Sequence, residues 1–205
     1  MSIFSTRQDL DLIASLVPNG ASVLDIGCGD GTLLRRLRDQ KDVKGYGLEI
    51  DGEDVSRAVA AGLSVVQGDA DTDLSDYPDG AFDIVILSNS IQALRRPDEA
   101  ISNAVRVGKQ AIVTFPNFGH WKVRAHLAFQ GTMPRSRALP DTWYETSNIH
   151  LCTVKDFVTF AKDQGFAIKA AYGLSGSEAP RAFPPGKGEL ANLLSEAALF
   201  LLSRA

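Results

Sequence analysis

The residues best suited to chemistry in this chain are three carboxylates, each of which follows a short apolar run. Asp25 stands within Val-Leu-Asp-Ile-Gly-Cys-Gly-Asp-Gly, residues 23–31, where a glycine-rich turn and an amphipathic segment come next. Glu49 ends a second run, about twenty residues beyond that turn, and Asp69 follows a third. A strand, a glycine-rich loop and a helix in this order predict a ligand loop at the edge of a parallel sheet.

The glycine-rich turn favours a cationic ligand over a phosphate. Its spacing is G-x-G-x-G, which differs from the G-x-G-x-x-G of dinucleotide-binding loops, and no Gly-Lys-Ser/Thr follows it. Gly27, Cys28 and Gly29 present a bare backbone with one small side chain, so a ligand can approach closely. Asp25 would repel a pyrophosphate and attract a cation. S-adenosylmethionine carries both a sulfonium and an ammonium group, and this turn resembles the first motif of the class I methyltransferases that bind it.

The other two acids match the remaining parts of the same ligand. A carboxylate at Glu49 can accept hydrogen bonds from both ribose hydroxyls, and Ile50 beside it would pack on the adenine face. Asp69 can receive the exocyclic amine of adenine, while the backbone N–H of Ala70 meets a ring nitrogen. A tight turn without a ligand, or a solvated acid at a strand end, would explain each feature alone. Together they predict a site for S-adenosylmethionine or S-adenosylhomocysteine.

These residues require a sheet that brings them together. The hydrophobic pattern predicts strands at residues 22–25, 44–49, 64–67, 82–88, 110–115, 166–172 and 198–202. It predicts helices at residues 7–17, 32–37, 53–61, 97–107, 154–164 and 189–197, and a mobile Gly/Ser/Pro-rich loop at residues 173–188.

This alternation is typical of one α/β domain over residues 1–205, with a Rossmann-like, seven-stranded, mostly parallel sheet and an antiparallel last strand. The carboxyl ends of the parallel strands would then gather Asp25, Glu49 and Asp69, with Ser88 near the sulfonium.

Composition excludes several classes of protein. The chain has 205 residues, of which 44% are hydrophobic and 22% charged, and its net charge of −4 argues against bulk nucleic-acid binding. We expect no membrane span and no export signal, and the two distant cysteines favour reduced thiols in the cytoplasm. The histidines are His120, His126 and His150, and no Cys or carboxylate cluster accompanies them, so we expect no metal site.

Residues 115–153 form an insertion that is too long for a plain crossover, and such connections are usually functional. Between residues 115 and 140 there are four basic residues and no acid, in a chain with 21 basic and 25 acidic residues. The four are Lys122, Arg124, Arg135 and Arg137. A docking patch for an acidic partner is one interpretation, and a pocket for a carboxylate or phosphate substrate is another. RNA contact is disfavoured by charge, and in the simplest alternative Trp121, Val123, Leu127 and Phe129 only cover the sheet.

Two motifs in the insertion resemble the MetW family of methionine biosynthesis proteins. They are Phe-Pro-Asn-Phe-Gly-His-Trp at residues 115–121 and Asn-Ile-His-Leu-Cys-Thr at residues 148–153. Further matching stretches lie at residues 7–10, 23–31, 47–51, 66–71, 82–88 and 133–136. The resemblance implies a methyltransferase-like fold and an association with homoserine O-acyltransferase, the enzyme that activates homoserine before sulfur is added.

We therefore expect a cytoplasmic partner of homoserine O-acyltransferase that binds S-adenosylmethionine or S-adenosylhomocysteine. Candidates for contact with the partner are His120, Trp121 and Arg124. The alternative is a genuine small-molecule methyltransferase with His120, Tyr144 or His150 as base or orienting group. Methyl transfer from a sulfonium can need only alignment, so the catalytic residues stay unassigned.

Overall fold

The computed structural model describes residues 8–136, 138–176 and 178–205, so Arg7 and Arg137 lie outside the described residues. Its helices are α1 (Gln8–Leu16), α2 (Thr32–Lys41), α3 (Gly52–Ala60), α4 (Pro97–Val107), α5 (Trp121–Gln130), α6 (Val154–Asp163) and α7 (Glu189–Leu194), with 3-10 turns η1 (Asp73–Asp76) and η2 (Ile91–Ala93). Its strands are β1 (Ser22–Ile26), β2 (Lys44–Glu49), β3 (Ser64–Gln67), β4 (Phe82–Ser88), β5 (Gly108–Pro116), β6 (Phe166–Leu174), β7 (Arg181–Ala182) and β8 (Ala197–Arg204).

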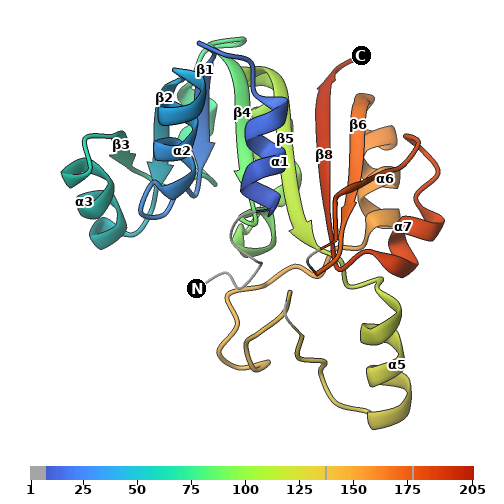
Figure 1. Ribbon diagram of the computed structural model, residues 1–205. Coiled ribbons are helices and arrows are strands. Elements are labelled where there is room, and N and C mark those ends of the chain that lie inside the picture. The colour runs from blue at the N-terminus through green and yellow to red at the C-terminus, as the bar shows by residue number, and fades with distance from the viewer. Residues whose placement is uncertain (1–7, 137, 177) are drawn as a thin grey trace.

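The strands form one sheet in the order β3-β2-β1-β4-β5-β8-β6-β7 (Figure 1). Strands β1 to β5 are parallel to one another, and β8 runs antiparallel between β5 and β6. The prediction of a Rossmann-like α/β fold with a mostly parallel sheet and an antiparallel last strand is confirmed.

Three details differ from the predicted pattern. The sheet has eight strands, because β7 pairs with Tyr172 and Gly173 of β6 inside the segment predicted as a loop. A two-residue strand is too short to leave a periodic signal. The last helix ends at Leu194, and β8 begins at Ala197 and reaches Arg204. The apolar run of β8 lies between two strands and is buried on both faces, so its periodicity cannot separate helix from strand.

Helices cover both faces of the sheet. On one face, α1 and α2 place Ile13 and Leu37 against Val23 and Ile84. On the other face, α4 and α6 cover a core that contains Phe115, Phe157 and Phe200. The Phe157 and Phe200 rings lie 4.5 Å apart between centroids, and the Phe115 and Phe200 rings are stacked at 5.9 Å. Each fully buried aromatic ring contributes about 2 to 3 kcal/mol, so this cluster anchors β8 against β5 and α6.

The residues between β5 and α6, 117–153, are called the insertion lobe below. Figure 1 shows α5 and the segment that follows it projecting beyond the sheet edge at which the parallel strands end. Within this lobe the sequence pattern did not predict α5, which is amphipathic only weakly and buries a single residue, Val123. Among the helices that the structure describes, none is both long and apolar enough to cross a membrane.

Candidate functional site

The strand register brings the predicted ligand residues to one edge of the sheet. Ile26 of β1 pairs with Leu48 of β2 and with Leu87 of β4, and Glu49 pairs with Gln67 of β3. The carboxyl ends of four strands are therefore neighbours. We call this region the glycine-loop edge. It comprises residues 25–31, 49–50, 69–70 and 88–90.

The glycines after β1 allow the backbone to turn where an L side chain would be strained. Gly27 has φ +71°, and a Cβ there would lie 3.1 Å from Cβ of Ser90, so this glycine allows the loops after β1 and β4 to approach. Gly29 has φ +54°, and a Cβ there would meet nothing within 4 Å. The backbone conformation at residue 29 therefore favours glycine, and the space beside it is open. Both features allow close approach of a ligand.

Glu49 binds the backbone of the glycine loop. Its Oε2 accepts a hydrogen bond from the N–H of Gly29 at 2.8 Å, and its Oε1 accepts from Ile50 and Asp51 at 2.8 and 3.0 Å. The carboxylate is 9% exposed. These bonds occupy both lone pairs of Oε1 and one of Oε2, which leaves Oε2 able to accept one more hydrogen bond. The predicted ribose acceptor therefore also holds the loop, a role that the sequence did not indicate.

Asp25 is buried, and one of its carboxylate oxygens has no hydrogen-bond partner among the described residues. It is 2% exposed, and its Oδ1 makes no hydrogen bond to any group that the structure describes. Burial, together with the nearby carboxylate of Glu49, raises the pKa of Asp25 to about 7. A cation or an N–H donor bound at this edge would stabilise the charged form of Asp25 and satisfy its free oxygen.

The loop after β4 carries two further buried oxygens that have no hydrogen-bond partner among the described residues. They are Oδ1 of Asn89 and Oγ of Ser90. Asn89 has φ +52°, a conformation that non-glycine residues rarely adopt, and its N–H donates to the backbone oxygen and the hydroxyl of Thr114 at 3.1 and 3.0 Å. Ser88 ends β4 and is half-buried beside them. Ser90 lies beside Gly27 of the glycine loop, and with the free oxygen of Asp25 the residues present fit a ligand with polar donors and a positive charge.

The third predicted acid is held in a network of carboxylates after β3. The N–H of Asp69 donates to Asp73 at 2.9 Å, and a side-chain oxygen of Asp69 accepts from the N–H of Asp71 at 2.9 Å. Asp71 in turn accepts from the N–H groups of Arg95 and Arg96, each at 2.9 Å, and so ties this loop to the start of α4. Ala70 is half-buried between them, whereas Ile50 is 63% exposed beside Glu49.

Cys28 contributes shape rather than reactivity. Its thiol is buried, and burial together with Asp25 raises its pKa to about 12. A thiol that stays protonated at neutral pH is a poor nucleophile. Within the part of the chain that the structure describes, no three His, Cys, Asp or Glu side chains are grouped to hold a metal ion.

Asn117 fixes the base of the insertion lobe and was missed by the sequence analysis. The side chain is 1% exposed, and its Nδ2 donates to the carbonyls of Asn192 and Ser195 at 2.9 and 2.7 Å. Its Oδ1 accepts from the N–H groups of Gly119 and Val154 at 2.9 and 3.2 Å. One buried amide thus joins both ends of the lobe to α7. The signal available in the sequence was an Asn that directly follows an apolar strand and its proline.

Gln92 connects the lobe to the glycine-loop edge. Its backbone oxygen accepts from the N–H groups of Ile149 and His150 at 2.8 and 3.0 Å. Its side-chain amide donates to the backbone oxygen of Asn89 at 2.7 Å. The lobe and the loop after β4 are therefore linked through one residue that is 8% exposed.

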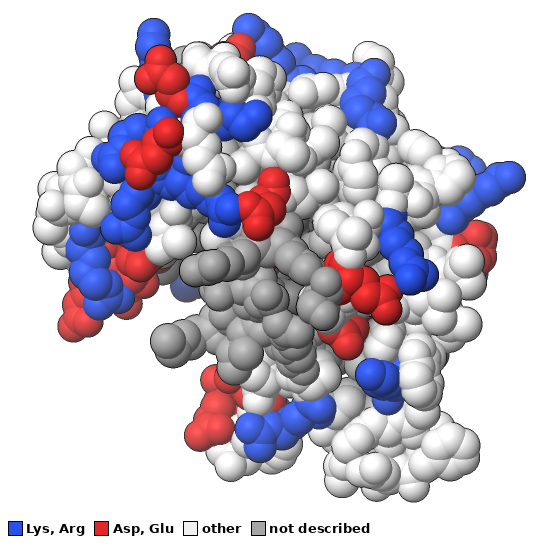
Figure 2. Space-filling view, viewed as in Figure 1, with Lys and Arg blue, Asp and Glu red and all other residues white. Residues whose placement is uncertain are grey.

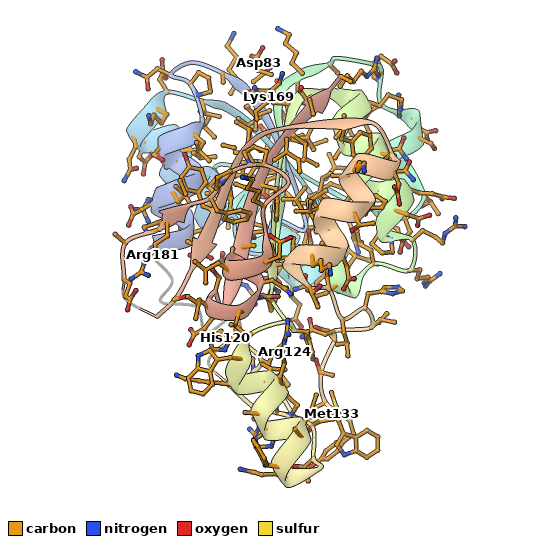
Figure 3. All side chains as sticks on the ribbon, turned by 90° about the vertical axis from the view of Figure 1, so that its right-hand side faces the viewer. Asp83, His120, Arg124, Met133, Lys169 and Arg181 are labelled. Atoms are coloured by element: carbon orange, nitrogen blue, oxygen red, sulfur yellow. The ribbon has the colours of Figure 1, made fainter. Side chains whose placement is uncertain are left out.

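The three residues predicted for partner contact have different environments (Figure 3). His120 caps the start of α5 and is 6% exposed, and burial lowers the pKa of its imidazole. The buried imidazole is therefore not accessible to a protein that binds at the surface. Trp121 is half exposed, and Arg124 is exposed while its Nε donates to the backbone oxygen of Gly119 at 2.6 Å.

The alternative in which α5 covers the sheet is wrong in most of its residues. Val123 is buried, but Trp121, Leu127 and Phe129 are exposed, and the exposed fraction of Phe129 reaches 89%. The helix points away from the sheet, so these side chains are free to contact something else.

Comparisons with known proteins agree on family and fold. A family model described as methionine biosynthesis protein MetW matches residues 7–202. The chain is 33% identical over 164 residues to a bifunctional methionine biosynthesis protein MetXA/MetW of Rhodopirellula baltica, which covers 76% of this chain and 26% of that protein. The chain spans between 26% and 35% of the length of the curated relatives it matches.

Solved structures show the same architecture at low sequence identity. A SAM-dependent methyltransferase from Archaeoglobus fulgidus superposes with a TM-score of 0.71 at 16% identity, covering 99% of this chain and 95% of that one. An S-adenosylmethionine-dependent methyltransferase from Mesorhizobium loti gives a TM-score of 0.69 at 18% identity, covering 98% and 99%. These likenesses establish a class I methyltransferase fold, and the match over residues 7–202 establishes that the chain belongs to the MetW family of methionine biosynthesis proteins.

Proposed function

We propose that this protein is a cytoplasmic partner of homoserine O-acyltransferase that binds S-adenosylmethionine or S-adenosylhomocysteine and supports the acylation of homoserine. The observation that carries the partnership is the Rhodopirellula relative, whose name joins MetXA and MetW in one bifunctional methionine biosynthesis protein. In a shared polypeptide, each of the two parts is present at a high effective concentration near the other, which favours contact between them.

The proposed ligand site is the glycine-loop edge. Asp25, with its free oxygen and raised pKa, is suited to a cationic group. Glu49 retains one acceptor position for a ribose hydroxyl, and Gly29 leaves the backbone open beside it. Asp69 and Ala70 would meet the adenine edge, Ile50 its face, and Ser88 would lie near the sulfur. Support for the ligand comes from the unsatisfied buried oxygens at this edge, since nothing in a packing role requires them.

Ligand binding and partner support are tested together with purified proteins. Calorimetry should show binding of S-adenosylhomocysteine to the wild type and weaker binding to Glu49→Gln, because the neutral amide loses the charge-assisted bonds to the ribose and to Gly29. Glu53→Gln is the matched control, since the side chain of Glu53 is 90% exposed on the neighbouring helix. The rate of homoserine acylation by homoserine O-acyltransferase should rise when the wild-type protein is added. Unchanged acylation would contradict the partnership.

A genuine small-molecule methyltransferase is the second candidate. The buried oxygens of Asn89 and Ser90 have no partner among the described residues, and His150 is held near them through the backbone of Gln92, so these groups are candidates to contact a methyl acceptor. A labelled methyl group that moves to a metabolite, with turnover lost in Glu49→Ala, would support this candidate. A partner whose effect does not depend on the ligand would keep its influence on acylation after the same change.

A further inference from the structure

We propose that the outer surface of the insertion lobe is the docking surface for homoserine O-acyltransferase. This assignment rests on the partnership proposed above and adds where and how the partner is recognised. The surface comprises α5 and the segment that returns from it, and its exposed apolar residues are Trp121, Leu127, Phe129, Met133, Trp143, Tyr144, Ile149 and Leu151.

Large apolar side chains are concentrated on this lobe. Eight of the fifteen that are exposed in the described chain belong to it, although it is a small part of the protein. Phe129 is 89% exposed and Trp143 is 73% exposed. Single exposed apolar residues are normal, but a set rich in aromatic rings on one small lobe is typical of a protein-protein interface.

Helix α5 is not stabilised by the body of the domain. It has 10 residues, and Val123 is the one residue that it buries. Figure 3 shows the helix projecting from the domain, with Arg124 at its base and Met133 beside it. Helices of this length are marginal in water without tertiary packing. A partner that covers exposed apolar side chains of α5, such as Leu127 and Phe129, would supply packing that the domain does not provide.

The segment after α5 forms a socket for an apolar anchor. A groove of about 160 Å³ is lined by Phe118, Met133, Leu139, Trp143, Ile149 and Leu151, among others. Its small size fits one large side chain rather than a metabolite or a peptide. Interfaces draw most of their binding energy from a few anchors seated in such pockets. The concave shape favours a protein partner over a lipid surface, which would need a convex apolar ridge.

Charge indicates the chemistry of the partner. Lys122 and Arg124 lie on α5, where no acid occurs, whereas Asp141 at the groove and Glu145 lie in the segment that returns from the helix. Figure 2 shows the end of the lobe at the lower right as mostly white, with little charge to repel an apolar partner. We therefore expect homoserine O-acyltransferase to place carboxylates opposite Lys122 and Arg124 of α5 and an apolar side chain in the groove.

The base of the lobe is fixed even though its tip is exposed. Asn117 ties both ends to α7, and the backbone oxygen of Gln92 holds Ile149 and His150. A surface that is already held in place loses less conformational entropy when the partner binds.

The test uses the full-length protein and purified homoserine O-acyltransferase from the same genome, with the dissociation constant measured by calorimetry. The double variant Phe129→Ser, Trp143→Ser should bind about tenfold more weakly or worse, because it removes two exposed anchors. Val59→Ser is the matched control, since Val59 is 52% exposed on α3 and lies outside the lobe. Retained binding of S-adenosylhomocysteine and an unchanged circular dichroism spectrum would show that the double variant is folded.

The outcomes separate the two proposals. Wild-type binding that the double variant retains at full strength would overturn the docking assignment and leave the partnership intact. Absence of a complex with the wild type would overturn the partnership, and the docking assignment with it. Self-association, or flotation with vesicles of anionic phospholipid, that the double variant loses while its affinity for the acyltransferase is unchanged would overturn the assignment in favour of a second copy or a membrane.

Discussion

The glycine-loop edge buries carboxylates beneath a bare backbone, whereas the insertion lobe exposes aromatic rings on a helix that barely touches the domain. At the edge, Asp25 and Glu49 are 2% and 9% exposed, and backbone N–H groups fix Glu49. On the lobe, Phe129 and Trp143 are 89% and 73% exposed. Both regions lie where the parallel strands end (Figure 1).

The difference shows how one fold can carry two kinds of recognition. Strand ends place polar groups rigidly, which suits a small ligand that must be held by a few exact hydrogen bonds. A long connection such as the insertion lobe adds surface area for binding without disturbing the sheet, because it is attached to the domain only at its base.

Removing the amide at the base of the lobe should have the largest effect. Asn117→Ala leaves two carbonyls and two N–H groups buried without partners, and each costs roughly 1 to 3 kcal/mol. We expect the free energy of unfolding in urea to fall by about 4 kcal/mol. Asn19→Ala, at an exposed turn, is the control and should change stability little. A loss as small as that of the control would mean that water reaches these groups and the lobe is not held by Asn117.

Neutralising the buried acid of the glycine-loop edge should change how stability depends on pH. The pKa of Asp25 is about 7 in the folded protein and 3.8 in an ordinary environment. Between these pH values the folded protein keeps the Asp25 proton, which the unfolded chain has released. The contribution of Asp25 to the free energy of unfolding is therefore fully present below pH 3.8 and is lost as the pH rises through 7.

Asparagine has no carboxyl group to titrate, so the stability of Asp25→Asn does not fall in this way. The variant should therefore become more stable relative to wild type as the pH rises from 3.8 to 7. The gain is on the order of 1 kcal/mol per pH unit. Urea denaturation at a series of pH values measures it. Parallel pH profiles for the two proteins would show that Asp25 is already ionised in the folded state.

Two glycine-to-alanine substitutions should distinguish the effect of blocking the ligand site from the effect of backbone strain. Gly29→Ala and Gly20→Ala both force alanine into a left-handed conformation, with φ +54° and +71°, and neither Cβ meets another group within 4 Å. Each should cost about 1 kcal/mol of stability. Only Gly29→Ala should weaken binding of S-adenosylhomocysteine, by about tenfold or more, because its methyl group occupies the ligand side. Equal affinity in both variants would place the ligand elsewhere.

Residues at the base of α5 should contribute least. Trp121→Ala with Arg124→Ala should weaken binding to homoserine O-acyltransferase by a few-fold, mostly through slower association, since rim charges act chiefly on the on-rate. Lys169→Ala removes a charge from the opposite end of the molecule and is the control (Figure 3). A loss larger than that caused by Phe129→Ser, Trp143→Ser would move the centre of the docking surface from the tip of the lobe to its base.

Much of the frame could be predicted because its signals are local. The apolar runs of β1, β2 and β4 and the glycine spacing after Asp25 predicted a mostly parallel sheet, and the motifs of the insertion indicated the MetW family. Helix α5 could not be predicted, because it has no buried stripe and so leaves no periodic pattern.

The order of residues along the chain places Asp25, Glu49, Asp69 and Ser88 at or near the ends of predicted strands, so a parallel sheet brings them to one edge. The partners of these side chains depend on tertiary packing. That Glu49 binds the N–H of Gly29, that Asn117 joins α7 to the lobe, and that His120 is buried all depend on contacts between residues distant in the chain. Periodicity reports which face of an element is apolar, but a hydrogen bond across 75 residues depends on how the elements pack in three dimensions.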